Sequence, residues 1–264
     1  MNGIVIGIDP VIFNIGDLEI RWYSMAIMLA IAVGIFITVR QANKKGIEPR
    51  QILSGAFWVV ISAILGARLF HVIDHFDYYM NNPSQIFQFQ GLAIWGAMVG
   101  GGLALIIYTR IRHIPLGRLV DALVPGLIVA QIIGRVGCII NGDAYGGVTD
   151  LPWAFIYTHP GAMIPDNLLG VPTHPYPLYE MIWNATVLVF VLRLGRYFKQ
   201  DGLVFLSYLS LYSVGRIIFT FVRQENLILG GLQQAQIIAL ITIAASVALM
   251  VYISRKKHVH KRIP

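Results

Sequence analysis

Seven long apolar stretches constrain the fold of this chain more than any other feature of its sequence. They cover residues 20–40, 52–72, 91–110, 119–140, 178–198, 203–222 and 233–254. A helix needs about 20 mostly apolar residues to cross the hydrocarbon of a bilayer, and each stretch has that length. The chain is 56% hydrophobic and 12% charged, whereas a soluble domain carries about a quarter charged residues. We therefore predict a single all-α integral membrane domain, residues 1–264, with seven transmembrane helices.

The connections between these spans are short, except for residues 141–177. This segment is rich in glycine and proline, and its apolar part at 153–157 is too short to cross a bilayer. We predict an ordered loop that lies outside the membrane or re-enters it. The N-terminus lacks a basic segment followed by an apolar run, so no cleavable signal peptide is expected. The single cysteine, Cys138, excludes an internal disulfide and a cysteine-based metal cluster.

The lysines and arginines are distributed unevenly between the two ends of the spans. Most of the 20 basic residues lie in alternate connections and in the C-terminal tail. Because cytoplasmic loops are enriched in Lys and Arg, this asymmetry predicts an outside N-terminus, a cytoplasmic C-terminus and an extracytoplasmic loop at 141–177. The net charge of +7 then reflects cytoplasmic loops and does not indicate nucleic-acid binding.

The basic residues that do not fit this cytoplasmic set are all arginines near the predicted outward ends of spans. They are Arg21, Arg68, Arg135, Arg216 and Arg223. An arginine within a span costs about 2.5 kcal/mol or more, so it is usually paired or lines a polar cavity. Guanidinium also binds phosphate in a bidentate manner. The alternative is that the side chains reach to the interface or pair with outward acids. For Arg135 and Arg216 together, the pattern favours a phospholipid headgroup site.

Residues 134–146 carry the most distinctive motif, Gly-Arg-Val-Gly-Cys-Ile-Ile-Asn-Gly-Asp-Ala-Tyr-Gly. Further blocks occur in order at 9–13, 21–23, 66–68 and 174–180, and in the sixth span with Gln224 after it. Together these blocks resemble the prolipoprotein diacylglyceryl transferases along nearly the whole chain. The resemblance implies seven membrane helices with an outward N-terminus, in agreement with the charge pattern. It also implies a multi-pass protein of the bacterial cytoplasmic (inner) membrane.

The resemblance implies a reaction as well. The diacylglyceryl group of phosphatidylglycerol is transferred to the thiol of the lipobox cysteine in a prolipoprotein signal peptide. A thioether forms and glycerol phosphate leaves, which is the first step of bacterial lipoprotein maturation. No cofactor or metal is expected. The thiolate is the reactive form of the nucleophile, and arginines at the phosphate would stabilise the charge that develops on the leaving group.

The motif positions of the family suggest specific site residues. The predicted catalytic residues are Arg135, Arg216, Tyr23 and His174. The predicted substrate-binding residues are Arg135, Asn141, Gly142, Asp143, Gly146, Arg68, Tyr212, Arg223, Glu180 and Trp95. Tyr212, Arg216, Thr220 and Arg223 also share one helical stripe, because they are spaced by four, four and three residues.

Several of these residues have a structural alternative. Asn141 either donates to headgroup oxygens or caps the backbone, and Glu180 either pairs with an arginine or orients His174. His174 accepts a proton or packs the loop, and Tyr23 alone would fit an ordinary interfacial aromatic. Glycines in the third span, Gly96 and 100–102, favour close helix packing.

The chain departs from the family pattern at four positions. Trp95 stands where many members have a histidine that has been favoured as the base, and tryptophan does not accept a proton. Cys138 and Asp143 replace the signature Asn and Glu, and Thr220 replaces an acid of some members. The remaining proton acceptors are His174, His71, Tyr23 or the departing phosphate through water.

Three other classes of membrane protein predict different sequence features or mutational effects. A transporter or channel predicts ionisable residues throughout the membrane depth and repeat symmetry, and neither pattern is visible. A lipid-binding scaffold without catalysis would tolerate Arg135→Ala. An intramembrane serine protease would need a Gly-x-Ser-x-Gly motif with a partner histidine, which the sequence lacks.

Overall fold

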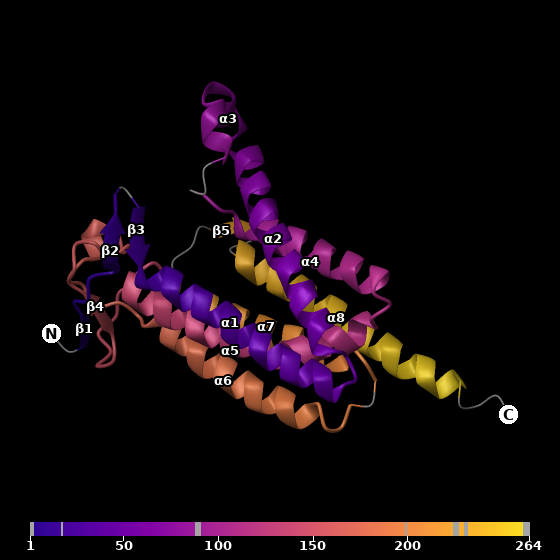
Figure 1. Cartoon of the computed structure of the whole chain (residues 1–264). Coiled ribbons are helices and arrows are strands. Elements are labelled where there is room, and N and C mark those ends of the chain that lie inside the picture. Colours follow the sequence, from indigo (N-terminus) through magenta and orange to yellow (C-terminus); the bar gives the residue numbers. More distant parts are fainter. Residues whose placement is uncertain are drawn as a thin grey trace. The chain divides into compact units, whose positions relative to one another are not determined.

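Seven helices in the computed structural model are long and apolar enough to cross a membrane (Figure 1). The structure describes residues 3–16, 18–87, 91–198, 200–223, 227–229 and 232–260, so Gln224 of the sixth-span motif lies outside it. The helices are α1 (Trp22–Lys44), α2 (Pro49–Asp74), α4 (Ile94–Ile111), α5 (Leu116–Asn141), α6 (Tyr176–Leu194), α7 (Leu203–Thr220) and α8 (Gln234–His260). The predicted number of spans is confirmed, whereas their orientation stays a prediction.

The described residues also form short elements that the sequence did not predict. These are α3 (Phe76–Asn81), the 3-10 helices η1 (Pro83–Phe87) and η2 (Asp166–Leu168), and the strands β1 (Ile4–Ile6), β2 (Val11–Ile15), β3 (Leu18–Arg21), β4 (Phe155–Tyr157), β5 (Leu227–Leu229) and β6 (Leu232–Gln233). β2 pairs with β3 and β5 with β6 in antiparallel hairpins. β1 pairs with β4 in parallel, with Ile4 opposite Phe155. The apolar part of the long loop is therefore a buried strand.

The chain divides into two compact units. The larger unit comprises residues 1–38 and 123–264, and the smaller unit comprises 39–122. In the smaller unit, α2 packs closely against α4. A Cβ atom on Gly96 would collide with the carbonyl oxygen of Gly66, and one on Gly100 with that of Ser62. The predicted packing role is confirmed for Gly96 and Gly100, because only a residue without a side chain permits such backbone approach, whereas a Cβ atom on Gly102 would meet open space.

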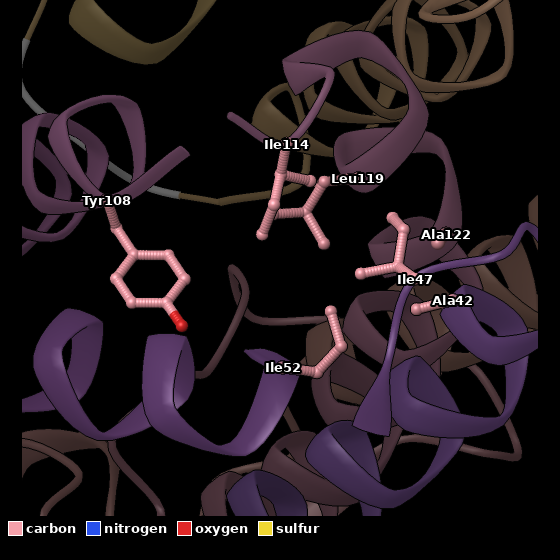
Figure 2. Close-up of a cluster of buried hydrophobic side chains, with 7 residues drawn as sticks. All are labelled: Ala42, Ile47, Ile52, Tyr108, Ile114, Leu119 and Ala122. Carbon is pink, nitrogen blue, oxygen red and sulfur yellow. The ribbon is translucent and has the colours of Figure 1, made fainter. Parts of the chain in front are cut away.

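The smaller unit also contains a compact hydrophobic core, which Figure 2 shows in close-up. It consists of Ala42, Ile47, Ile52, Tyr108, Ile114, Leu119 and Ala122. An ion pair joins Lys45 to Asp121 at 3.9 Å, and the Asp121 residue is only 4% exposed. The ion pair links the connection after α1 to the first turns of α5.

In the larger unit, α5 contacts α1 along one side (Figure 1). A Cβ atom on Gly137 would lie 2.9 Å from the Cβ atom of Ala26 and 3.2 Å from the Cα atom of Tyr23. α5 ends at Asn141 because Gly142 adopts a φ of 77°, which glycine tolerates, and its N–H donates to the Cys138 carbonyl at 2.9 Å. The signature motif therefore occupies the last turns of α5 and the start of the following loop.

Candidate active site

Glu180 lies at the centre of a group of buried polar side chains in the larger unit. The residue is only 5% exposed. Its Oε1 accepts hydrogen bonds from the Tyr176 hydroxyl and from Nη1 of Arg216, both at 2.9 Å, and its Oε2 forms an ion pair with Nη2 of Arg135. Nη1 of Arg216 also donates to the Tyr176 hydroxyl at 2.6 Å. One carboxylate therefore holds guanidinium groups from two helices together, which confirms the predicted pairing of Glu180 with an arginine.

Three helices bring these side chains together near their ends. Arg135 lies within the last two turns of α5, and Arg216 lies about one turn before the end of α7. Tyr176 begins α6 and Glu180 follows four residues later, so both occupy one face of that helix. We call this end of the three helices the loop side, because residues 142–175 connect α5 to α6 there. The converging arginines thus lie at one end of the spans.

The two arginines retain positive charge and hydrogen-bonding capacity beyond what Glu180 uses. One carboxylate neutralises one of two guanidinium charges. The side chains of Arg135 and Arg216 are 23% and 22% exposed, so a ligand has access to both. Among the described residues, no acceptor contacts Nε or Nη2 of Arg216. A guanidinium presents N–H donors at all three nitrogens, so Arg216 is able to hold an additional anion.

Arg223 and Cys138 complete the surroundings of the two arginines. The guanidinium of Arg223 lies 5.4 Å from the ring centre of Tyr176, and that of Arg135 lies 5.9 Å from the same ring. Nη1 of Arg135 donates to the Cys138 sulfur at 3.6 Å. Both distances to the ring are within the range of cation–π attraction. The sequence did not single out Tyr176, although its four-residue spacing from Glu180 was a usable signal.

Asn141 anchors the start of the loop through protein contacts. Its Oδ1 accepts a hydrogen bond from Nη1 of Arg21 at 3.4 Å, and its Nδ2 lies 3.2 Å from the sulfur of Met163. Its carbonyl accepts the backbone N–H of Met163 at 2.8 Å. Arg21 itself forms an exposed ion pair with Glu19 at 2.7 Å. The side chain of Asn141 thus links the N-terminal hairpin to the long loop.

Asp143 and Tyr157 are polar groups of this loop that the protein leaves partly unsatisfied. Within the described part of the chain, Oδ1 of Asp143 and the hydroxyl of Tyr157 are buried and have no hydrogen-bond partner. Burial first, and then the charge of Asp143, raise the pKa of the Tyr157 hydroxyl. Gly146 follows in tight contact with the loop, because a Cβ atom there would lie 2.7 Å from the Cβ atom of His174.

His174 and Tyr23 contact other side chains of the larger unit. Nδ1 of His174 lies 3.3 Å from the Tyr179 hydroxyl, which accepts a hydrogen bond from Nε1 of Trp153 at 3.1 Å. The backbone N–H of His174 donates to Gly147 at 2.9 Å. Tyr23 packs against the hydrophobic cluster that contains Cys138. The structure thus places both residues beside the signature segment, whereas their catalytic roles stay predictions.

Arg68 and Trp95 belong to the smaller unit. Arg68 donates to the backbone carbonyls of Ile86 at 2.9 Å, of Gly91 at 3.1 Å and of Gln85. Its guanidinium also lies 5.0 Å from the ring centre of Tyr79. These contacts hold the segment after α3 in place. Trp95 is the second residue of α4, and 39% of it is exposed.

Tyr212, Arg216 and Thr220 share one face of α7, as the four-residue spacing predicted. Arg223 lies beyond Thr220, the last residue of α7, so the predicted helical stripe does not extend to it. The structure adds two residues that the sequence did not reveal, Gln131 of α5 and Tyr208 of α7. Nε2 of Gln131 donates to the Tyr208 hydroxyl at 2.9 Å. Both lie one turn further from the loop side, Gln131 relative to Arg135 and Tyr208 relative to Tyr212.

Comparison with known proteins shows the family of this chain. Residues 10–252 match the model of the family described as prolipoprotein diacylglyceryl transferase. A phosphatidylglycerol–prolipoprotein diacylglyceryl transferase from Dehalococcoides mccartyi is 39% identical over 96% of both chains. Proteins of the same description from Clostridioides difficile and Synechococcus elongatus are 36% and 38% identical, over 94% and 92% of this chain and 96% and 87% of their own. A match over most of the length, with the signature arginine at the centre of the site, leads to one conclusion: this chain belongs to the prolipoprotein diacylglyceryl transferase family.

Proposed function

We propose that this chain transfers the diacylglyceryl group of phosphatidylglycerol to the lipobox cysteine of a prolipoprotein, in the cytoplasmic membrane of a bacterium. The observation that carries the proposal is that Glu180 pairs with both Arg135 and Arg216. The two arginines keep N–H donors that Glu180 does not use. Family membership makes the chain a multi-pass membrane transferase of lipoprotein maturation. The charge pattern supports an extracytoplasmic loop side, where signal peptides emerge.

The electrostatics of the site suit the leaving group of this reaction. The cysteine sulfur attacks the glyceryl carbon that carries the phosphate oxygen, and the carbon–oxygen bond breaks. The electron pair of that bond moves to the phosphate, so a phosphodiester monoanion becomes a monoester with a second ionisable oxygen. Donors that are already aimed at this oxygen stabilise the transition state more than the substrate. The unused N–H groups of Arg216, beside Arg135, would be such donors for a phosphate bound at the two arginines.

The thiol proton needs an acceptor in this scheme. Nδ1 of His174 contacts the Tyr179 hydroxyl, so this histidine would accept the proton through Nε2 if Nδ1–H donates to that hydroxyl. A phosphate monoester has a second pKa of about 6 and is itself an acceptor of histidine strength. Trp95 adds no acceptor, because an indole N–H only donates.

The test uses purified protein in detergent, dioleoyl phosphatidylglycerol and a synthetic lipobox peptide. We expect the peptide to gain the mass of one diacylglyceryl group, and Arg135→Ala and Arg216→Ala to lose this activity while remaining folded. Arg216→Lys should also be strongly impaired, because lysine lacks the planar fork. Arg196→Ala, at an exposed position after α6, is the matched control with normal turnover. Absence of the mass gain, or near-normal rates for both alanine variants, would overturn the proposal.

A further inference from the structure

A row of polar side chains continues from the arginines away from the loop side. We call it the polar track, and it consists of Gln131, Tyr208 and Tyr212. Gln131 lies four residues before Arg135 on α5. Tyr212 and Tyr208 lie four and eight residues before Arg216 on α7. At about 5.4 Å per helical turn, Tyr212 is one turn deeper in the membrane than Arg216, and Tyr208 is two turns deeper.

Within the described part of the chain, the polar track retains hydrogen-bond donors that no other group uses. Because the oxygen of Tyr208 accepts from Gln131, its hydroxyl hydrogen points elsewhere. No acceptor for the hydroxyl of Tyr208 or of Tyr212 occurs among the described residues, and the two rings lie 5.9 Å apart. If the amide of Gln131 is rotated by half a turn, the hydroxyl of Tyr208 is satisfied, but the amide N–H groups become free. In either arrangement the track offers donors.

The hydroxyl of Tyr208 lies in an apolar core, where an unused hydrogen-bonding group is unfavourable. Val124, Ile128 and Val187 form the surrounding core, and Tyr208 is only 3% exposed. Polar groups without partners are destabilising in such surroundings, and in membrane spans they are typical of functional sites. A ligand that brings hydrogen-bond acceptors to this depth would satisfy them.

A diacyl phospholipid has hydrogen-bond acceptors inward of its phosphate. If its phosphate lies at Arg135 and Arg216, its two ester carbonyls follow inward of the phosphate and precede the acyl chains. We propose that the hydroxyls of Tyr212 and Tyr208, the latter held by Gln131, donate to these ester carbonyls and make the protein selective for diacyl over dialkyl lipids. The assignment rests on the proposed function, because the arginine–phosphate contact sets the depth of the lipid.

The experiment compares phosphatidylglycerol that carries two ester-linked chains with the ether-linked analogue of the same chain length. The reacting carbon and the phosphate are identical in the two lipids, so only the carbonyls differ. We expect the unaltered protein to show a higher kcat/KM for the diester by roughly 2- to 12-fold for each hydrogen bond. Tyr212→Phe should reduce kcat/KM for the diester by this factor and leave that for the diether unchanged. Tyr208→Phe is measured in the same way.

The ratio of the two rates is taken within one preparation, so partial loss of folded protein cancels. Tyr197→Phe, which removes a hydroxyl from a residue 79% exposed, should keep the full preference for the diester. Equal turnover of the two lipids by the unaltered protein would overturn the assignment, as would equal losses on both lipids in both variants. Absence of turnover with the diester would instead overturn the proposed function.

Discussion

Replacing Glu180 by glutamine should destabilise the larger unit substantially. The substitution keeps the shape of the side chain but removes the charge that Arg135 and Arg216 share. Removing one partner of a buried ion pair costs about 3–5 kcal/mol, because the opposite charge remains buried and unpaired. Both arginine side chains are between a fifth and a quarter exposed, so we expect the lower end, about 3 kcal/mol. For a chain of this length that corresponds to a loss of roughly 6–12 °C in Tm.

Glu19→Gln is the matched control for this measurement. Glu19 also pairs with an arginine, Arg21 at 2.7 Å, but its side chain is 50% exposed. Exposed pairs contribute less than about 1 kcal/mol, so this variant should lose only a few degrees. Both variants are melted in detergent with phosphatidylglycerol and with a diacylglycerol, which lacks the phosphate. Phosphatidylglycerol should restore Glu180→Gln more than it stabilises the unaltered protein, because its phosphate replaces the missing charge. Equal Tm losses for the two variants, or equal rescue by the diacylglycerol, would refute this reasoning.

Three further substitutions test separate parts of the structure. Asp121→Asn should lower the free energy of unfolding by about 1 kcal/mol, since it removes the charged partner of Lys45, whose side chain is 35% exposed and keeps water contacts; a larger loss in thermal unfolding would contradict it. Gly96→Leu should prevent α2 and α4 from packing, because its side chain would meet the carbonyl of Gly66, and a normal yield of folded protein would show that the approach is not required. Tyr157→Phe should leave Tm unchanged or raise it, because it removes a buried hydroxyl without a partner among the described residues; a loss of several degrees would reveal an unrecognised hydrogen bond.

The spans were predictable because a bilayer requires long apolar runs, and such runs are visible without knowledge of tertiary contacts. The short strands were not, because β1 and β4 have three residues each and depend on partners about 150 positions apart. Their pairing is a property of the folded chain, and neither three-residue segment has a sequence pattern that predicts its partner.

The candidate site was predictable in part. Arg135, Glu180 and Arg216 were identified from motifs, and a charge in a span needs a partner, so their meeting follows from the physics of burial. Arg68 shows the limit of this reasoning. It was predicted as a substrate-binding residue, yet the contacts described for it include three backbone carbonyls of residues 85–91. The sequence shows where a charged residue lies along the chain. Which backbone carbonyls contact it depends on how residues 85–91 fold, and this is not visible in the sequence.

The pairing of β1 with β4 imposes a parity condition on the number of crossings. Two segments that exchange backbone hydrogen bonds outside the spans must lie on the same side of a membrane. Between them run α1, α2, α4 and α5, an even number of crossings. The N–H of Gly147 donates to the carbonyl of Val222 at 2.9 Å, and the two crossings between them, α6 and α7, are again even. Loss or gain of a single crossing would separate these partners, so two small backbone contacts restrict which topologies this chain is able to adopt.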